Sequence, residues 1–111
     1  MGLYIDAACR YGFDCDLYPA NSDEQVALAG EVAQVIESVH DTVFTFGPIC
    51  QTLYGVGGGS TDYVYDVAGA EYAWALELRD QGDFGFVLPP EQIRPTGEEM
   101  WAGIRYLLTN I

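Results

Sequence analysis

Residues 72–79, with the sequence YAWALELR, restrict the fold more than any other segment. Up to Leu76 this segment carries no charge and is rich in aromatic and aliphatic side chains, which predicts a strand buried on both faces. A strand of that kind needs covering layers. Helical patterns occur both before and after it in the sequence, so we expect an α/β fold in which helices cover a sheet.

The helix that precedes this strand has the clearest pattern. Ser22 is a candidate N-cap, and Gln25, three residues later, completes a capping box. The apolar residues that follow share one face at helical spacing: Leu28, Val32, Val35, Ile36 and Val39. This pattern predicts an amphipathic helix that ends near His40 and Asp41.

A second amphipathic helix is predicted at the end of the sequence. Thr96 and Glu99 have the spacing of another capping box. The apolar residues on one face of this helix are Trp101, Ile104, Leu108 and Ile111. The chain thus has a helical pattern on either side of its central strands.

Two shorter strands complete the predicted sheet. Residues 43–46 alternate between apolar and other side chains and precede Gly47-Pro48, which stops a strand. Residues 49–54 predict a second strand, which ends where a glycine run begins. With the segment 72–79 these make a partial mixed sheet of about three strands, flanked by helices. The length of 111 residues fits one domain that spans residues 1–111.

The remaining segments predict loops and one short helix. Residues 55–59 contain four glycines but lack the spacing of a phosphate-binding loop, so we expect a mobile loop beside a cleft. Ser60 or Thr61 is a candidate cap for a short helix over residues 62–68. Residues 1–21 predict irregular structure after a short apolar opening.

The charge balance excludes two classes of partner. The net charge is −13, and all four basic residues are arginines. Such a chain repels phosphate backbones and anionic lipid surfaces, so we expect neither nucleic-acid nor membrane-surface binding. No apolar run approaches the ~20 residues of a membrane span. The first six residues also lack the basic flank and apolar stretch of a signal peptide.

Metal-binding residues are scarce in this sequence. His40 is its single histidine, and the three cysteines include no Cys-x-x-Cys pair. A zinc site needs three or four ligands, usually with one closely spaced pair, so no metal site is predicted. We expect His40 to favour the negative end of the helix that it follows. The cysteines fit either one disulfide and a free thiol or three reduced thiols.

Glu77 does not fit a plain core. Strand alternation places it on the same face as Ala73, Ala75 and Arg79, where the small alanines leave open space. An unpaired buried carboxylate is costly, so Glu77 either pairs with Arg79 or lines a polar cleft as a general base or acid. Arg79 and Asp80 are also candidates for an ion pair at the strand end. Tyr54, beside the glycine run, has a hydroxyl that can swing over a cleft.

Several linked motifs resemble the C-terminal third of zinc carboxypeptidases of the carboxypeptidase A type. Their sequences are most similar to those of secreted fungal members. The match runs in order from about Tyr11 to the end, and residues 1–10 diverge from the family. The matching segments are residues 46–54, 58–63, 77–82, 84–86 and 88–96. The resemblance implies the C-terminal part of a carboxypeptidase-like α/β/α fold.

The resemblance also implies roles for individual residues. Glu77 matches the catalytic glutamate, which takes a proton from the zinc-bound water and passes it to the leaving amine. Tyr54 matches the tyrosine that closes over the C-terminal carboxylate of a peptide substrate. The residues that match the walls of the side-chain pocket are Ile49, Leu53, Val56, Thr61 and Ala75. A neutral Thr61 at the pocket floor implies a preference for apolar or aromatic C-terminal residues.

Other implications concern covalent structure and location. Cys15 and Cys50 match a disulfide pair of some family members, which leaves Cys9 unpaired. The family resemblance implies an extracellular protein, although this sequence shows no signal peptide. Zinc is the cofactor of the full-length family, but its ligands belong to the N-terminal two-thirds, so none is expected for this chain alone.

Three functions remain open at this stage, the third being an acidic structural domain whose cleft residues are relics of the family site. The first is a truncated zinc metallocarboxypeptidase-like protein that is inactive alone. The second is a non-catalytic peptide- or protein-binding module that uses the half-pocket. Because the segment 72–79 lies inside a larger sheet in the family, we also expect its edges to favour self-association or a complementing chain.

Overall fold

The computed structural model of this chain describes residues 1–5 and 18–111. Its elements follow in this order: β1 (Gly2–Ile5), α1 (Ser22–His40), β2 (Thr45–Pro48), α2 (Ile49–Thr52), α3 (Ser60–Asp66), β3 (Trp74–Glu77), the 3-10 turn η1 (Pro90–Gln92) and α4 (Ile93–Asn110). The predicted α/β class is confirmed.

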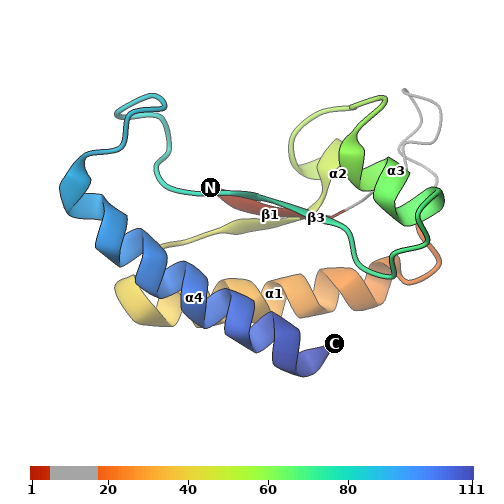
Figure 1. Ribbon diagram of the computed structural model, residues 1–111, viewed down its shortest axis with the longest axis horizontal. Coiled ribbons are helices and arrows are strands. Elements are labelled where there is room, and N and C mark those ends of the chain that lie inside the picture. The colour runs from red at the N-terminus through yellow and green to blue at the C-terminus, as the bar shows by residue number, and fades with distance from the viewer. Residues whose placement is uncertain (6–17) are drawn as a thin grey trace.

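The strands form one mixed three-stranded sheet in the order β2-β1-β3 (Figure 1). Strand β1 is parallel to β2 and antiparallel to β3. The register places Leu3 of β1 opposite Phe46 of β2 and Leu76 of β3. A partial mixed sheet of about three strands, flanked by helices, was the sequence prediction, and the structure confirms it.

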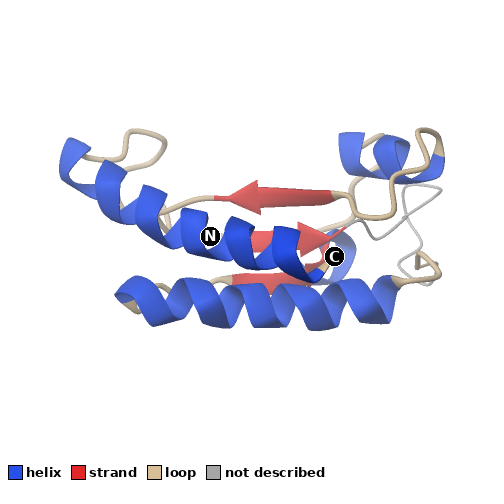
Figure 2. Cartoon of the chain, turned by 60° about the horizontal axis from the view of Figure 1, so that its bottom comes forward, coloured by secondary structure: helices blue, strands red, loops and turns tan. Residues whose placement is uncertain are grey.

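Helices α1 and α4 pack together on one face of this sheet (Figures 1 and 2). Leu3 and Ile36 are fully buried, and Val32 and Met100 are nearly so. The two helices lie in close contact at Gly103, where a Cβ atom would lie only 2.7 Å from Ile36 Cγ1. The core of the described chain therefore lies between β1 and this helix pair.

The structure corrects the prediction for the N-terminal residues. Residues 2–5 form the central strand β1 rather than irregular structure, and Leu3 is buried between the sheet and the helices. A four-residue strand carries too little periodicity to be recognised in isolation. It is stabilised by pairing on both edges, with β2 and with β3.

The prediction of a strand within residues 72–79 was correct, but the prediction that both of its faces are buried was wrong. Strand β3 spans only Trp74–Glu77 and lies at an edge of the sheet. Leu76 and Glu77 are exposed. The apolar composition reflects one covered face, because α1 and α4 lie on the same side of the sheet.

The second predicted strand, residues 49–54, was wrong. Residues 49–52 form the short helix α2, in which the Thr52 hydroxyl donates a 2.7 Å hydrogen bond to the Pro48 carbonyl. Strand β2 lies two residues later than predicted and includes Gly47 and Pro48. Proline is tolerated there because β2 is an edge strand, where a missing N–H group need not break a ladder.

Both predicted capping boxes were also wrong. Ser22 is the first residue of α1, and the Gln25 side chain donates to the side chain of Asn21 instead. Helix α4 begins at Ile93, so Thr96 lies inside it and donates to the Gln92 carbonyl. The predicted end of the first helix at His40 is confirmed.

The apolar face predicted for the last helix points outward. Met100 and Gly103 are buried, whereas Trp101 is 66% exposed and Leu108 is 63% exposed. Among the described residues, no helix combines the length and apolarity needed to cross a membrane.

Candidate active site

On the face of the sheet opposite to α1 and α4, β2 and β3 place three small residues beside Glu77. Phe46 and Leu76 share the face of Leu3, and the Phe46 ring lies 3.2 Å from the position that a Cβ atom would take on Gly30 of α1. Alternation therefore directs their neighbours to the opposite face: Thr45, Gly47, Ala75 and Glu77. Helices α1 and α4 both lie on the first face, so neither helix fills the space beside Glu77.

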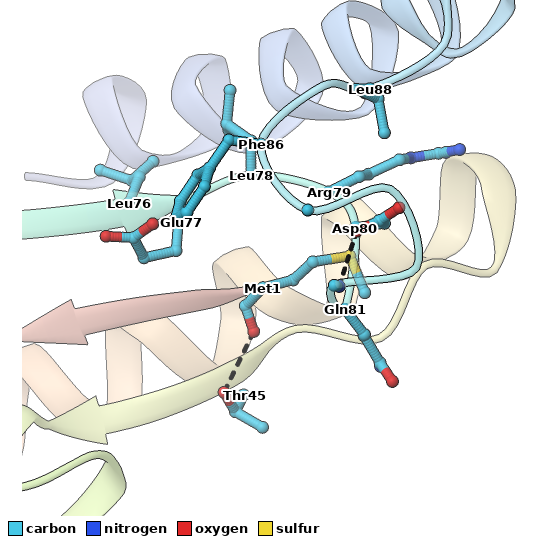
Figure 3. Close-up of a pocket in the computed structure, with 12 residues that line it drawn as sticks. Met1, Thr45, Leu76, Glu77, Leu78, Arg79, Asp80, Gln81, Phe86 and Leu88 are labelled. Atoms are coloured by element: carbon cyan, nitrogen blue, oxygen red, sulfur yellow. Dashed lines mark hydrogen bonds between the residues drawn. The ribbon is translucent and has the colours of Figure 1, made fainter.

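A cavity of about 760 Å³ occupies this space (Figure 3). It lies at the end of β3 that carries Glu77, beside the start of β1 and β2. Its walls come from Met1, Thr45, residues 76–82, Gly85, Phe86 and Leu88. Phe86 is fully exposed, so an aromatic ring and a carboxylate both line an open cavity.

Arg79 is held on the opposite side of the strand end by a buried network. Its Nε atom donates to Glu99 Oε1 at 2.7 Å, and its Nη2 atom donates to Glu99 Oε2 at 2.6 Å. The Thr42 hydroxyl accepts a 3.0 Å hydrogen bond from Arg79 and donates one of 2.7 Å to Glu99. Glu99 is fully buried. The network joins the end of β3 to helix α4.

The charges in this network stabilise each other. Burial raises the pKa of Glu99, but hydrogen bonds from Arg79 and Thr42 outweigh this effect and hold the pKa below its ordinary value. The hydrogen bond to Glu99 in turn raises the pKa of Arg79. Both groups therefore stay charged near neutral pH, and the ion pair persists.

This network corrects two predicted ion pairs. Arg79 binds Glu99 rather than Glu77 or Asp80. The Asp80 carboxylate accepts hydrogen bonds from the backbone N–H groups of Gly82 at 2.6 Å and Phe84 at 3.2 Å. The Glu77 carboxylate has no hydrogen bond or ion pair with another residue of the described part of the chain. Of the two interpretations of Glu77, the structure favours the one that places it in a cleft.

A second polar network holds the other end of β3. Trp74 Nε1 donates a 2.9 Å hydrogen bond to Gln25 Oε1, and Gln25 Nε2 donates one of 2.9 Å to Asn21 Oδ1. Asn21 Nδ2 donates to the Glu71 carbonyl at 2.8 Å, and the Tyr65 hydroxyl donates to Asn21 Oδ1 at 3.0 Å. Gln25 is fully buried. The start of α1 thus fixes both β3 and α3.

The other candidate residues lie towards the Trp74 end of β3. Ile5 pairs with both Pro48 and Trp74, so α2 begins at that end of the sheet. Trp74 lies three residues from Glu77, which is about 10 Å along a strand. None of the six substrate-binding candidates lines the 760 Å³ cavity: Ile49, Leu53, Tyr54, Val56, Thr61 and Ala75.

Part of this candidate set nevertheless comes together. The side chains of Val56 and Thr61 both lie 3.8 Å from the position that a Cβ atom would take on Gly59. Ala75 shares the open face of β3 with Glu77, whereas Tyr54 is 67% exposed. The structure therefore places Val56, Thr61 and the Asp62 carboxylate around Gly59, and places Ala75 on the face of Glu77.

Comparisons with known proteins place these features in a family. A family model described as zinc carboxypeptidase matches residues 6–103. The chain belongs to the zinc carboxypeptidase family. The predicted family resemblance is thus confirmed.

Curated relatives of this carboxypeptidase-family chain include fungal and mammalian proteins. It is 46% identical over 101 residues to the metallocarboxypeptidase A-like protein of Trichophyton verrucosum (strain HKI 0517), and 41% identical to carboxypeptidase A2 of Mus musculus. Each match covers 91% of this chain and 24% of the relative. The chain therefore spans about a quarter of the length of these relatives.

Solved structures agree with this assignment of the fold. The structure resembles bovine thrombin-activatable fibrinolysis inhibitor, solved in complex with tick carboxypeptidase inhibitor, with a TM-score of 0.84 and 28% identity over 100% of this chain and 37% of that chain. It also resembles carboxypeptidase A from Helicoverpa armigera, with a TM-score of 0.74 and 29% identity over 85% of this chain and 24% of that chain.

The described residues do not fit the zinc ion of the family name. No group of three or more His, Cys, Asp or Glu side chains in residues 1–5 and 18–111 is arranged to hold a metal ion. His40 lies at the end of α1, where its Nε2 atom is 2.9 Å from Glu98 Oε2. Cys9 and Cys15 lie outside the described residues, so the Cys15–Cys50 disulfide stays a prediction.

Sequence reasoning missed the residues that hold β3 in place. Glu99 was interpreted as a capping residue, although it shares the helical face of Met100 and Gly103, where a charge needs a buried partner. Gln25 was likewise assigned to a cap, although it lies on the face of Leu28 and Val32. A polar residue on the apolar face of a helix was the available signal in both cases.

Proposed function

We propose that this chain supplies the general base and part of the side-chain pocket of a metallocarboxypeptidase site that acts on peptide C-termini. The observation that carries the proposal is the position of Glu77, whose exposed carboxylate borders a cavity of about 760 Å³. Arg79, the nearest cation in sequence, is occupied by Glu99. A carboxylate left open in this way is available to take a proton from a reacting group.

The proposed pocket consists of Ile49, Leu53, Val56, Thr61 and Ala75. The position of Val56 and Thr61 beside Gly59, together with the Asp62 carboxylate, supports placing both in one region of the pocket. Thr61 is neutral, which favours an apolar or aromatic C-terminal side chain over a charged one. Tyr54 is proposed to close over the substrate carboxylate, and the glycines beside it allow the backbone swing that this requires.

The chain by itself is proposed to lack hydrolytic activity. Zinc supplies the electrophile in this family, and the described residues offer no donor set for it. Glu77 alone can move a proton but cannot polarise a peptide carbonyl. In line with the family resemblance, we also propose an extracellular location.

The alternative function is a non-catalytic module that binds peptides or proteins through the half-pocket. One observation favours it: Phe86 is fully exposed beside the Glu77 cavity, where it offers an apolar contact without any metal. Both functions require peptide binding by this chain, and they differ in whether the bound peptide is cleaved once the zinc-binding part of the family fold is present.

Peptide binding and zinc content test the proposal together. The purified chain is dialysed, assayed for zinc, and titrated with blocked dipeptides that end in phenylalanine or lysine. We expect no stoichiometric zinc, no hydrolysis, and tighter binding of the phenylalanine peptide. Thr61→Asp should shift the preference towards lysine, while Ser60→Asp, which adds the same charge one residue away, should shift it much less. Equal binding of both peptides by all three proteins would contradict the proposed pocket.

A further inference from the structure

The side chain of Asn21 joins three parts of the chain at one end of the sheet. Its Oδ1 atom accepts hydrogen bonds from Gln25 Nε2 at 2.9 Å and from the Tyr65 hydroxyl at 3.0 Å, and its Nδ2 atom donates one of 2.8 Å to the Glu71 carbonyl. Gln25 belongs to α1, Tyr65 to α3, and Glu71 precedes β3. Asn21 therefore connects the start of α1 both to α3 and to the segment that leads into β3.

Donor and acceptor chemistry allows one orientation of this network. The Trp74 indole can only donate, so the Gln25 side chain presents Oε1 to it and Nε2 to Asn21. Asn21 must then present Oδ1 to Gln25, which turns Nδ2 towards the Glu71 carbonyl, a group that can only accept. The Tyr65 hydroxyl donates to the second lone pair of Oδ1. Each oxygen and nitrogen of the two carboxamides thus has a partner of the required kind.

The Asn21 side chain does not cap its own helix. Asn21 is the N-cap residue of α1, a position where an asparagine side chain normally accepts a hydrogen bond from a backbone N–H group of the first turn. Its side chain makes no such bond here. The carboxamide instead serves the elements around the start of α1, which points to a role in their placement.

One of these elements carries the proposed pocket floor. Thr61 and Tyr65 are four residues apart on α3, so they lie on the same face of this helix. None of the seven residues of α3 is buried, so hydrogen bonds rather than core packing hold the helix in this chain. Figures 1 and 2 show α3 and the start of α1 at the same end of the sheet. The bond from Tyr65 to Asn21 therefore orients the face that carries Thr61.

The other element carries Ala75, on the opposite wall of the proposed pocket. Trp74 packs against the core, and its indole donates to the fully buried Gln25. Strand alternation then directs Ala75, the next residue, to the other face of the sheet. Asn21 also holds the Glu71 carbonyl, four residues before Ala75. The start of α1 thus fixes this wall as well.

We propose that Asn21 and Tyr65 are positioning residues that set the distance between Thr61 on α3 and Ala75 on β3. This inference rests on the pocket proposed above. Neither residue touches the peptide; both act through the two walls that they hold. A fixed distance between the walls favours a large apolar side chain that contacts both, such as phenylalanine, over the small side chain of alanine.

NMR titration of the chain with blocked dipeptides that end in phenylalanine or alanine tests the inference. Tyr65→Phe removes only the hydroxyl, and the preference for phenylalanine should fall about tenfold, the effect of about one methylene group of lost contact. A merely structural role would lower the fraction of competent protein and weaken both peptides equally, so the ratio would not change. Tyr106→Phe is the matched control, because it removes a hydroxyl that binds Glu31 of α1 at 2.9 Å, outside the proposed pocket.

A second variant removes the acceptor of the same hydrogen bond. Asn21→Ala should lower the preference for phenylalanine at least as much as Tyr65→Phe does. Adding Tyr65→Phe to Asn21→Ala should change the ratio no further, because both substitutions act through one bond. Two independent effects that multiply in the double variant would contradict the inference.

Hydrogen exchange gives a readout that needs no peptide. Amide exchange within residues 60–67 should become several-fold faster in Tyr65→Phe and stay unchanged in Tyr106→Phe. Unchanged exchange in α3 would overturn the inference, as would an unchanged ratio in Tyr65→Phe while Thr61→Asp alters the peptide preference. If the parent chain binds both peptides equally and Thr61→Asp has no effect, the proposed pocket itself is wrong, and the inference is overturned with it.

Discussion

The Arg79 guanidinium binds the Glu99 carboxylate through two hydrogen bonds, of 2.7 and 2.6 Å, and so links the end of β3 to the middle of α4. Arg79 lies two residues after Glu77, with only Leu78 between them. The ion pair keeps the arginine on the helical side of the sheet, which leaves the Glu77 carboxylate without a competing cation. The geometry of the candidate site therefore depends on Glu99, a residue that does not line the cavity.

Removing the carboxylate of Glu99 should destabilise the fold strongly. In Glu99→Gln, the Arg79 charge stays in a mostly buried position without its partner, which typically costs about 3–5 kcal/mol. Glu98→Gln is the matched control, because Glu98 is adjacent but exposed, and it binds Arg94 at the surface. Urea unfolding should give a much larger decrease in the free energy of unfolding for Glu99→Gln. Similar decreases in the free energy of unfolding would show that the buried ion pair contributes no more to stability than the exposed one.

The same ion pair predicts how stability depends on pH. The pKa of Glu99 is lower in the folded state than its ordinary value of 4.5, because the hydrogen bonds from Arg79 and Thr42 outweigh the effect of burial. The unfolded chain thus binds the proton more readily, and Glu99 contributes stability that is fully present above pH 4.5. This contribution is lost as the pH falls through the folded pKa. Unfolding measured from neutral to acid pH should show a shallower decline in Glu99→Gln than in the parent chain.

Long local patterns predicted their elements well. Helix α1 was placed to within a residue at its C-terminal end because its apolar face, acidic first turn and final histidine all act locally. Strand β1 was missed because its four residues become a strand only through β2 and β3, which lie far along the chain. Residues 49–52 were misassigned because the hydrogen bond from Thr52 to Pro48 favours a helical turn over an extended segment.

The sequence predicted the carboxylate of the candidate site, Glu77, but not the residue that forms an ion pair with the neighbouring Arg79. Glu77 was identified because it interrupts an apolar strand, which the sequence alone reveals. The partner of Arg79 was wrong because it depends on how α4 packs, and that in turn depends on the contact of Gly103 with Ile36. Side-chain pairs between distant elements follow from tertiary packing, which spacing along the sequence does not encode.

The hydrogen bond from Trp74 to the buried Gln25 should contribute measurably to stability. Trp74→Phe keeps an aromatic ring but leaves Gln25 Oε1 without its donor, which costs about 1–3 kcal/mol for a buried polar group. Trp101→Phe is the matched control, because Trp101 is 66% exposed. Thermal unfolding of both variants should show a marked decrease in the melting temperature for Trp74→Phe only. Equal decreases would contradict the role of the Gln25 contact.

The cysteines give a prediction about covalent structure. In material produced under oxidising conditions, Cys15 and Cys50 should be bonded and Cys9 should react with alkylating reagents. A bond between them would close a loop worth about 3–4 kcal/mol in the chain-entropy model. Peptide mapping by mass spectrometry identifies the pair. A bond from Cys9 to either of the other cysteines would show that the family correspondence does not hold for this chain.

Two glycines of α4 should respond in opposite ways to the same substitution. In Gly103→Ala, the new Cβ atom would lie 2.7 Å from Ile36 Cγ1 and 2.9 Å from Ile36 Cδ1, so α1 and α4 must move apart. Overpacking of this kind typically costs about 1–3 kcal/mol. Gly97 is exposed on the same helix, and a Cβ atom there would meet no other atom within 4 Å. Gly97→Ala should therefore stabilise the chain by up to about 1 kcal/mol, through the higher helix propensity of alanine. Urea unfolding of the two variants should show a lower free energy of unfolding for Gly103→Ala and a higher one for Gly97→Ala. A stabilising Gly103→Ala would contradict the close contact between α1 and α4 that places Glu99 beside Arg79.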